Sequence, residues 1–178
     1  MQYLERDNAF QKFDQFWAEM QEEWFKAEVL QDYSGEDNGP SLQAWLAGEK
    51  DRSMELLTAD APSWVNKALQ KADVRRIRVH IVDEPYTSHL EWEMECYRRV
   101  NIPLAKEGVY LVPRTKIPDL DLPDGDFSIF DDTRVIKFNY SQNGSAQSGE
   151  IYEKGEDISH FLKLKEELLK QADPLEKF

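Results

Sequence analysis

Residues 75–83 read RRIRVHIVD, and this stretch decides the fold class. Apolar and polar side chains alternate along it, which is the period-two pattern of a β-strand. One face of this strand would carry Ile77, Val79 and Ile81. The other face would carry Arg76, Arg78 and His80. The strand is expected to end at Glu84 and Pro85.

The segment that follows predicts a helix and then a second strand. Ser88 is a candidate N-cap with Glu91 three residues later, which is the spacing of a capping box. The helix would run to about Val100, and residues 109–112 would form the second strand. Because a helix joins the two strands, they can lie parallel in one sheet.

Three further strands are expected close together, at residues 127–130, 134–140 and 149–153. Asn143–Gly144, between the last two, is a strong turn signal. Short turns join neighbouring strands in antiparallel order, so these three should form a meander. Beyond them, apolar residues at helical spacing predict a helix over residues 157–171.

The segment before residue 74 is expected to be helical. Apolar residues recur there every three or four positions, which predicts one face of an amphipathic helix. These residues are Phe10, Phe13, Trp17, Met20 and Trp24. The helix would begin near Asn8 and end between Phe25 and Leu30, although residues 27–33 fit a short extended segment equally well. Shorter helices are expected over residues 41–47, 53–59 and 63–73.

Together these elements indicate a single α+β domain over residues 1–178. Its parts would be an N-terminal helical part (8–73), a sheet-forming part (74–155) and a C-terminal helix (156–173). The sheet should be mixed and partly antiparallel, with about five strands and helices packed on it. A chain of 178 residues corresponds to one domain and buries roughly 70% of the surface that its unfolded form exposes.

The charge of the chain limits its partners. The net charge is −13, so direct binding of nucleic acid is not expected, because phosphate binding depends on Lys and Arg. Residues 75–116 differ, with eight Lys or Arg against six Asp or Glu. A basic protein partner, or a small anion held by this segment, fits the distribution better than a membrane surface does.

Cysteine content and hydropathy bear on the compartment. Cys96 is the only cysteine, which excludes an intramolecular disulfide and favours a reducing compartment. Residues 1–7 lack the features of a secretory signal, and no apolar run approaches the ~18 residues that span a bilayer. We therefore expect a cytoplasmic protein without a membrane partner. The sequence leaves the oligomeric state open.

Basic side chains form the first candidate site. Arg76, Arg78 and His80 share one predicted strand face, and Arg114 follows the second strand. Guanidinium groups suit phosphate or carboxylate, so these four residues predict a site for an anion. The alternative is an internal salt network with acidic residues of the following helix, which are Glu91, Glu93 and Glu95.

No pattern in the sequence predicts catalysis, a metal site or a cofactor. Residues 119–126 (DLDLPDGD) resemble a calcium loop, but the glycine comes one position late and Phe130 stands where the loop needs a glutamate. No two histidines share a metal-ligand spacing. Asp126 and Asp131 form a candidate acid and base pair, but they bracket a short strand and are expected to hold turns. An enzyme is therefore the less favoured reading.

Several segments, taken in order, resemble a known family. They are residues 75–85 (RRIRVHIVDEP), 89–97 (HLEWEMECY), 108–114 (GVYLVPR) and 122–132 (LPDGDFSIFDD). This set resembles a family of uncharacterised bacterial domains, mostly actinobacterial, whose genes often lie beside helix-turn-helix regulators of the XRE type. The resemblance implies that a shared site would involve Glu84, Glu93, Tyr97, Arg114, Asp126 and Asp131. The alternative is that these residues hold strand-to-helix junctions together.

Three functions stay open on this basis. The favoured one is a non-catalytic binding or regulatory module that acts through a protein partner, such as a cognate DNA-binding regulator. The second is a receptor or enzyme for a small phosphorylated or otherwise anionic ligand. The third is an immunity or antitoxin-like accessory protein.

Overall fold

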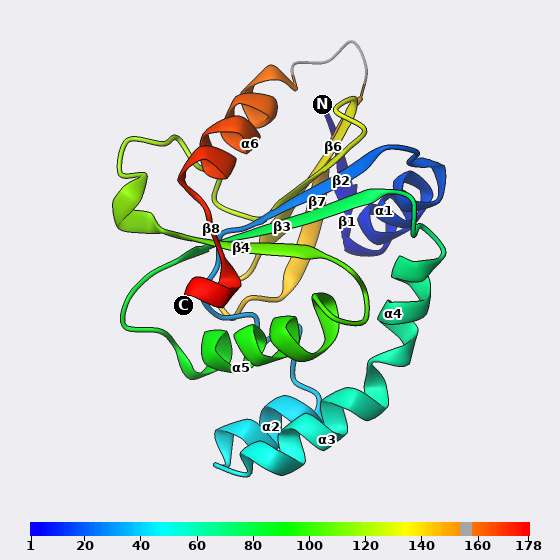
Figure 1. Cartoon of the computed structure of the whole chain (residues 1–178). Coiled ribbons are helices and arrows are strands. Elements are labelled where there is room, and N and C mark those ends of the chain that lie inside the picture. Colours follow the sequence, from blue (N-terminus) through cyan, green and yellow to red (C-terminus); the bar gives the residue numbers. More distant parts are fainter. Residues whose placement is uncertain (154–157) are drawn as a thin grey trace.

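The computed structural model describes residues 1–153 and 158–178. It has an α+β fold in which helices cover both faces of one mixed sheet (Figure 1). The strand order is β1-β7-β6-β5-β2-β3-β4-β8. In chain order the strands are β1 Gln2–Glu5, β2 Glu23–Glu28, β3 Arg75–Val82, β4 Gly108–Pro113, β5 Phe127–Phe130, β6 Arg134–Tyr140, β7 Ala146–Tyr152 and β8 Asp173–Pro174.

In the described part of the chain, six α-helices and two shorter helical turns join the strands, and a third short turn follows β8. The α-helices are α1 Arg6–Glu19, α2 Pro40–Leu46, α3 Lys50–Asp60, α4 Pro62–Leu69, α5 Ser88–Cys96 and α6 Ser159–Gln171. The shorter turns are the π-helical turn η1 Tyr97–Asn101 and the 3-10 turns η2 Arg114–Lys116 and η3 Leu175–Lys177. None of the described helices is long and apolar enough to cross a membrane.

Strand β2 corrects the prediction for the first helix. Helix α1 ends at Glu19, and Trp24 belongs to a strand at the centre of the sheet, parallel to β3 and antiparallel to β5. Trp24 and Phe25 point to opposite faces of the sheet, yet they are 1% and 0% exposed. Because Trp24 falls four residues after Met20, the spacing of the apolar residues continues a helical pattern across the boundary by coincidence.

Over the described residues, the sheet therefore has eight strands rather than about five. Besides β2, the two edge strands β1 and β8 were not predicted, because they have four and two residues and carry too little pattern. The parallel pairing of β3 with β4 is confirmed, and so is the antiparallel meander of β5, β6 and β7.

The predicted helix boundaries need smaller corrections. Thr87, rather than Ser88, caps α5, since its side chain accepts a hydrogen bond from Leu90 N. The regular α-helix ends at Cys96, and the predicted continuation to Val100 is a π-helical turn. Helix α6 is described from Ser159, and the expected start at residue 157 lies outside the described residues.

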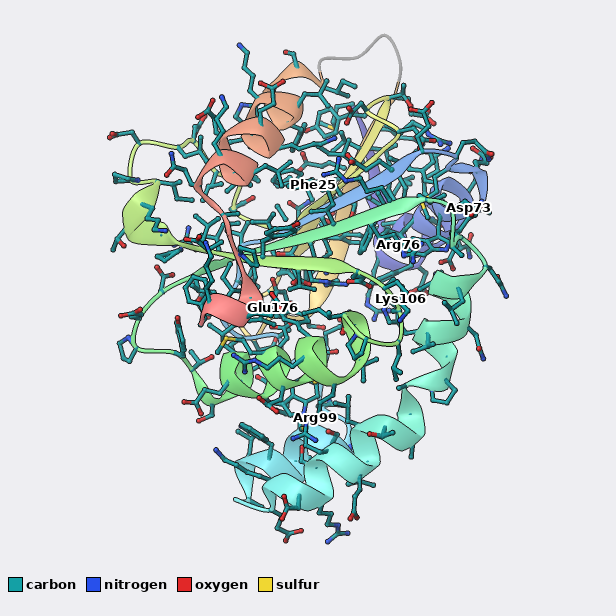
Figure 2. The ribbon with its side chains drawn as sticks, viewed as in Figure 1. Phe25, Asp73, Arg76, Arg99, Lys106 and Glu176 are labelled. Carbon is teal, nitrogen blue, oxygen red and sulfur yellow. The ribbon has the colours of Figure 1, made fainter. Side chains whose placement is uncertain are left out.

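The two faces of the sheet differ in character. Helix α6 covers one face, where Phe25 lies (Figure 2). Ile77, Val79 and Ile81 pack with Phe25 and with residues of α6 in one apolar cluster. The opposite face carries α1 over β5, β6 and β7, and α5 over β3 and β4 (Figure 1). Arg76, Arg78 and His80 lie on this second face, so the predicted alternation of β3 is confirmed.

Candidate functional site

Helices α2, α3 and α4 form a crossover arm, residues 40–69, between β2 and β3. One end of the arm contacts α5, where Trp92 Nε1 donates to Ser41 Oγ at 3.0 Å. The other end contacts α1, where Lys67 Nζ lies 2.5 Å from Asp14 Oδ1. The arm therefore bridges α5 and α1 on the same side of the sheet.

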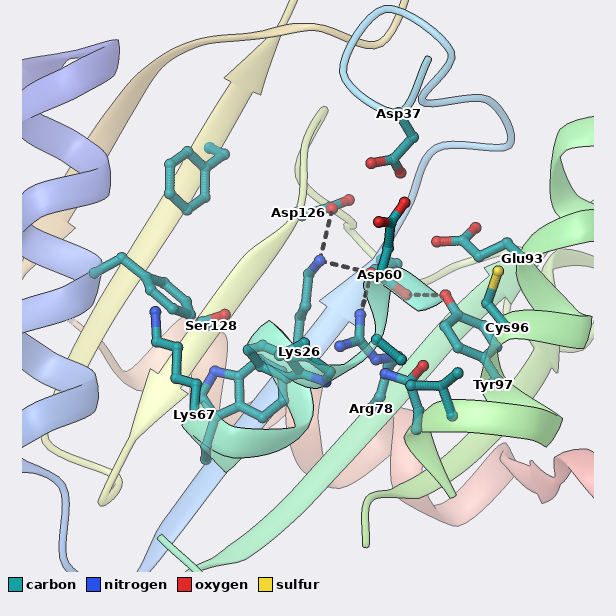
Figure 3. A pocket seen from close by; sticks show the side chains of 18 of the residues that line it. Lys26, Asp37, Asp60, Lys67, Arg78, Glu93, Cys96, Tyr97, Asp126 and Ser128 are labelled. Atoms are coloured by element: carbon teal, nitrogen blue, oxygen red, sulfur yellow. Dashed lines mark hydrogen bonds and ion pairs between the residues drawn. The ribbon is translucent and has the colours of Figure 1, made fainter. Parts of the chain in front are cut away.

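A pocket of about 540 Å³ lies between this arm and the sheet (Figure 3). Its floor comes from β2, β3, β5 and β6, and its walls come from α1, α5, η1 and the arm. The apolar wall residues include Phe10, Phe13, Leu57, Trp64 and Trp92. The floor is polar, so the pocket combines apolar walls with a charged base.

Lys26, Glu28 and Arg78 form the charged centre of the floor. Glu28 Oε1 accepts from Lys26 Nζ at 2.6 Å and from Arg78 NH1 at 2.5 Å. Arg78 also donates from Nε to Glu107 Oε2 at 3.0 Å. The strand register explains the arrangement, because β2 and β3 place Lys26 beside Arg78 and so bring two like charges together. Glu28 and Glu107 neutralise them.

This ion cluster fixes the charge of Glu28. Burial alone would raise the pKa of Glu28, but Arg78 and Lys26 lower it below its usual range. Glu28 is therefore ionised at neutral pH. A buried carboxylate is tolerated only when it is paired and hydrogen-bonded, and Glu28 meets both conditions.

His80 and Tyr97 complete the surroundings of Glu28. Tyr97 donates its hydroxyl to Glu28 Oε2 at 2.5 Å. His80 Nε2 lies 2.8 Å from Leu30 O, which only accepts, so Nε2 carries the proton. Burial lowers the pKa of His80, which leaves a neutral ring. The lone pair of His80 Nδ1 therefore faces Tyr97 Oη at 3.1 Å.

Glu93 has an unusual position beside this group. It is 8% exposed, and its Oε2 has no hydrogen-bond partner among the described residues. The nearest basic atoms are His80 Nδ1 at 3.6 Å and His89 Nδ1 at 4.0 Å. Burial, followed by the negative charges of Glu28 and Asp37, raises the pKa of Glu93 well above its usual range. Glu93 therefore takes up a proton when no cation is near.

Asp126 is buried at the start of β5. Its carboxylate accepts from Val29 N, Tyr33 Oη and Tyr140 Oη at 2.9, 2.8 and 3.0 Å. Burial nevertheless raises its pKa, although Lys26 at 3.7 Å lowers it in part. Asp126 holds the loop after β2 against the end of β6.

Three of these side chains also offer metal-ligand atoms. One atom each from Glu28, His80 and Glu93 lies within 4.8 Å of the others in the described part of the chain. Histidine nitrogen and carboxylate oxygen are ordinary ligands of divalent metals. However, Lys26 and Arg78 already bind Glu28 Oε1, and their positive charges would repel a divalent ion there.

The structure separates the four residues predicted to bind an anion. Arg78 lies on the pocket floor, and His80 lies behind it against Glu28. Arg76 donates instead to backbone carbonyls of Lys71, Val74 and Ala105. Arg114 does not join them, because it binds the Asp83 carboxylate at 3.0 Å and Val29 O at 2.9 Å. The acidic partners of Arg78 come from β2 and from the segment before β4 rather than from α5.

The six residues implied by the family resemblance also divide into groups. Glu93, Tyr97 and Asp126 line the pocket. Glu84 is exposed and precedes a cis proline. Asp131 accepts backbone N–H bonds from the residues that enter β2, which are Gln21, Glu22 and Glu23. It therefore holds a turn, at the opposite end of β5 from Asp126.

Lys26, Glu28 and Glu107 were missed from the sequence. Residues 24–29 (WFKAEV) show the same alternation as residues 75–83, with Lys26 and Glu28 on one face. Recognising β2 would have placed both charges beside Arg78. Glu107 lies in a loop, and no signal in the sequence points to its burial.

Comparisons with known proteins give a family and a distant structural similarity. A family model described as a domain of unknown function (DUF6879) matches residues 11–178. No curated protein matches the sequence. The chain is similar to a solved structure of TrmBL2, described as an archaeal chromatin protein, with 11% identity and a TM-score of 0.49. The match covers 98% of this chain and 55% of that one, and it carries no functional argument.

Proposed function

The chain belongs to the DUF6879 family, whose description names no activity, and we propose from its site alone that it is a small-molecule-binding module. The observation that supports this proposal is the pocket of about 540 Å³ between the crossover arm and the sheet. Ligand pockets are usually concave, mostly apolar and supplied with a few fixed polar groups. The pocket has these three properties.

Binding fits the site better than catalysis does. The polar floor residues mostly hydrogen-bond to one another, which leaves Lys26 and Arg78 paired with Glu28. Cys96 also lines the pocket, but burial raises the pKa of its thiol, and a protonated thiol is a poor nucleophile. We therefore propose a receptor whose pocket is preformed.

A neutral apolar dye tests whether the pocket takes a ligand. Nile red should bind with one-to-one stoichiometry, and its fluorescence should rise as it leaves water. Leu57→Trp should reduce this binding about tenfold or more, because Leu57 lines the pocket and the larger ring would fill it. Leu46→Trp is the matched control, since Leu46 is 52% exposed on α2 and is not a lining residue.

The outcomes separate clearly. Dye binding that both variants leave unchanged would place the dye on the surface and remove the support for a pocket receptor. Loss of binding in Leu57→Trp alone would support it. Circular dichroism of both variants should match the wild-type spectrum, which shows that the loss does not come from unfolding.

We also propose that the module acts through a protein partner. The net charge of −13 favours a basic partner. The resemblance to actinobacterial domains encoded beside XRE-type regulators makes a DNA-binding regulator the first candidate. In this proposal, ligand occupancy of the pocket changes the affinity for the regulator.

A pull-down from the host, read by mass spectrometry at low and high salt, tests the partner proposal. A basic DNA-binding protein that is retained at low salt and released at high salt would support it. Recovery of no protein at either salt concentration would contradict it. The dye experiment is independent of this result.

A further inference from the structure

We propose that the ligand of this pocket is an organic cation. Its ammonium or guanidinium group would lie against Glu93 and Asp37, and its apolar body would pack on the aromatic rings of the walls. This inference rests on the proposed function, because it names the ligand class for the same pocket.

The charges that line the pocket determine the sign of the charge that a ligand should carry. Six lining residues are acidic, and three are basic. The acidic residues are Asp14, Glu28, Asp37, Asp60, Glu93 and Asp126. The basic residues are Lys26, Lys67 and Arg78. With every group except Glu93 ionised, the lining would carry two more negative charges than positive ones.

All three basic residues already have carboxylate partners. Lys67 binds Asp14 at 2.5 Å, and Lys26 and Arg78 share Glu28 Oε1. The Lys67–Asp14 pair is exposed, but at Lys26 and Arg78 an incoming anion would have to break a buried ion pair before it gained a contact. Breaking such a pair leaves an uncompensated buried charge, which is costly. The floor is closed to anions in this arrangement.

Glu93 supplies a buried carboxylate oxygen without a partner. Its Oε2 makes no hydrogen bond within the described residues, and the carboxylate points from α5 toward the pocket (Figure 3). Its histidine neighbours, His80 and His89, both have lowered pKa values because of burial, so neither supplies a positive charge. A cationic N–H donor from a ligand would satisfy this oxygen and replace the proton that Glu93 otherwise holds.

Asp37 supplies the second carboxylate. It lies in the loop after β2, and its Oδ2 is 3.9 Å from Nε2 of His89. His89 precedes Glu93 by one helical turn on α5. In Figure 3 Asp37 reaches from that loop toward the pocket. Its side chain is 49% exposed, so it stands where a ligand would enter.

The aromatic walls suit the same chemistry. Native cations already lie over these rings: the Arg78 guanidinium carbon is 5.5 Å from the Trp24 ring centre and 5.4 Å from that of Tyr97. Lys67 Nζ lies 5.4 Å from the Phe13 ring centre. Aromatic faces attract cations, and tryptophan does so most strongly. Trp64 and Trp92 line the same pocket without such a cation in the described residues.

Three probes of similar shape and different charge test the inference. They are phenethylamine, phenylethanol and phenylpropanoate, which are a cation, a neutral molecule and an anion at neutral pH. Isothermal titration calorimetry should give an affinity for the amine about tenfold or more above that for the alcohol. The carboxylate should bind more weakly than the alcohol.

The variant Glu93→Gln tests whether Glu93 causes the preference for the amine. The change keeps the shape of the side chain and removes its charge, so the amine should lose its preference and bind like the alcohol. Glu95→Gln is the matched control on the same helix, because Glu95 pairs with Arg98 and Arg99 outside the pocket. It should leave the preference unchanged.

The results distinguish this inference from the proposed function. Equal or tighter binding of the alcohol or the carboxylate would overturn the cation proposal and leave a pocket receptor. Zinc binding that depends on Glu93, together with no amine binding, would assign Glu28, His80 and Glu93 to a metal and overturn it as well. If Nile red also fails to bind, the pocket receptor itself is contradicted.

Discussion

Arg78 and Glu28 form a buried ion pair, with 2.5 Å between NH1 and Oε1 and side chains 9% and 3% exposed. The pair joins neighbouring central strands of the sheet, β3 and β2. Arg78 also binds Glu107, so one guanidinium compensates two buried carboxylates. The polar floor of the pocket depends on this residue.

Replacing Arg78 by methionine should destabilise the protein strongly. The substitution would leave Glu28 and Glu107 without their main positive partner in a buried site, and breaking a buried pair costs about 3–5 kcal/mol. Urea unfolding measures the free energy. Arg75→Met on the same strand should cost about 1 kcal/mol or less, because Arg75 is 68% exposed in its pair with Glu23. Similar values for the two variants would refute the central role of Arg78.

Glu93→Gln should instead stabilise the protein without ligand. A carboxyl whose pKa is raised by folding keeps its proton in the folded state at pH values where the unfolded chain has lost it. The free energy of unfolding then falls as pH rises from the ordinary glutamate value of 4.5 toward the raised value, by up to about 1.4 kcal/mol per pH unit. Glutamine removes this loss.

Urea unfolding at about pH 4 and about pH 7 tests the sign of this effect. The variant and the wild type should differ little at the lower pH, and the variant should be more stable at the higher pH. A variant that is less stable at neutral pH would show that ionised Glu93 is satisfied within the protein. Higher stability with lost amine binding would indicate that Glu93 is retained for the ligand.

Asp131→Ala should weaken the entry to β2. Asp131 has φ 51° and accepts three backbone N–H bonds, so alanine would lose these bonds and keep an unfavourable backbone conformation. We expect a loss of about 2–3 kcal/mol. Asp132→Ala is a matched control, because Asp132 also has φ 51° but its side chain is 57% exposed in its pair with Lys165. Equal losses would assign the whole effect to the backbone conformation.

As pH changes, Asp131 and Glu93 affect the free energy of unfolding in opposite directions. Burial raises the pKa of Asp131, but the backbone N–H groups of Glu22, Glu23 and Gln21 lower it below 3.8 overall. Its contribution is therefore present above the ordinary aspartate pKa and is lost as pH falls. The difference in stability between wild type and Asp131→Ala should shrink in acid.

The sequence predicted the parts of the fold that carry a clear local period. Alternation along residues 75–82 identified β3 and its two faces, and the turn residues around 131–133 and 143–144 identified the meander. Strand β2 was missed because Trp24, its first aromatic residue, continues the helical spacing of α1. Without β2, the order of the eight strands could not be predicted.

The candidate site was harder to predict for the same reason. Arg78, Glu93, Tyr97 and Asp126 were singled out, and they do line one pocket. The sequence did not identify their partner Glu28. Arg78 was therefore interpreted as an unpaired cation, and the expected ligand was an anion. The register between β2 and β3 shows that Arg78 is paired with Glu28. The carboxyl that lacks a hydrogen-bond partner is then Glu93.

Binding of phenethylamine should weaken as pH falls through about 6. Burial raises the pKa of Asp37 to about 6, with contributions from Glu28 and Glu36 and with opposition from Lys26 and Arg78. Below this pH the carboxylate takes up a proton and loses its attraction for an ammonium group. Burial lowers the pKa of His89, next to Asp37, below 6.5, so this ring takes up a proton only in acid and would then repel the amine further. Because Asp37 is half exposed, we expect a change of only a few fold.

Calorimetric titrations across this pH range, with phenylethanol as the uncharged control, measure the effect. Asp37→Asn should remove the step near pH 6, and a step that persists in this variant would assign the titration to another carboxyl of the pocket.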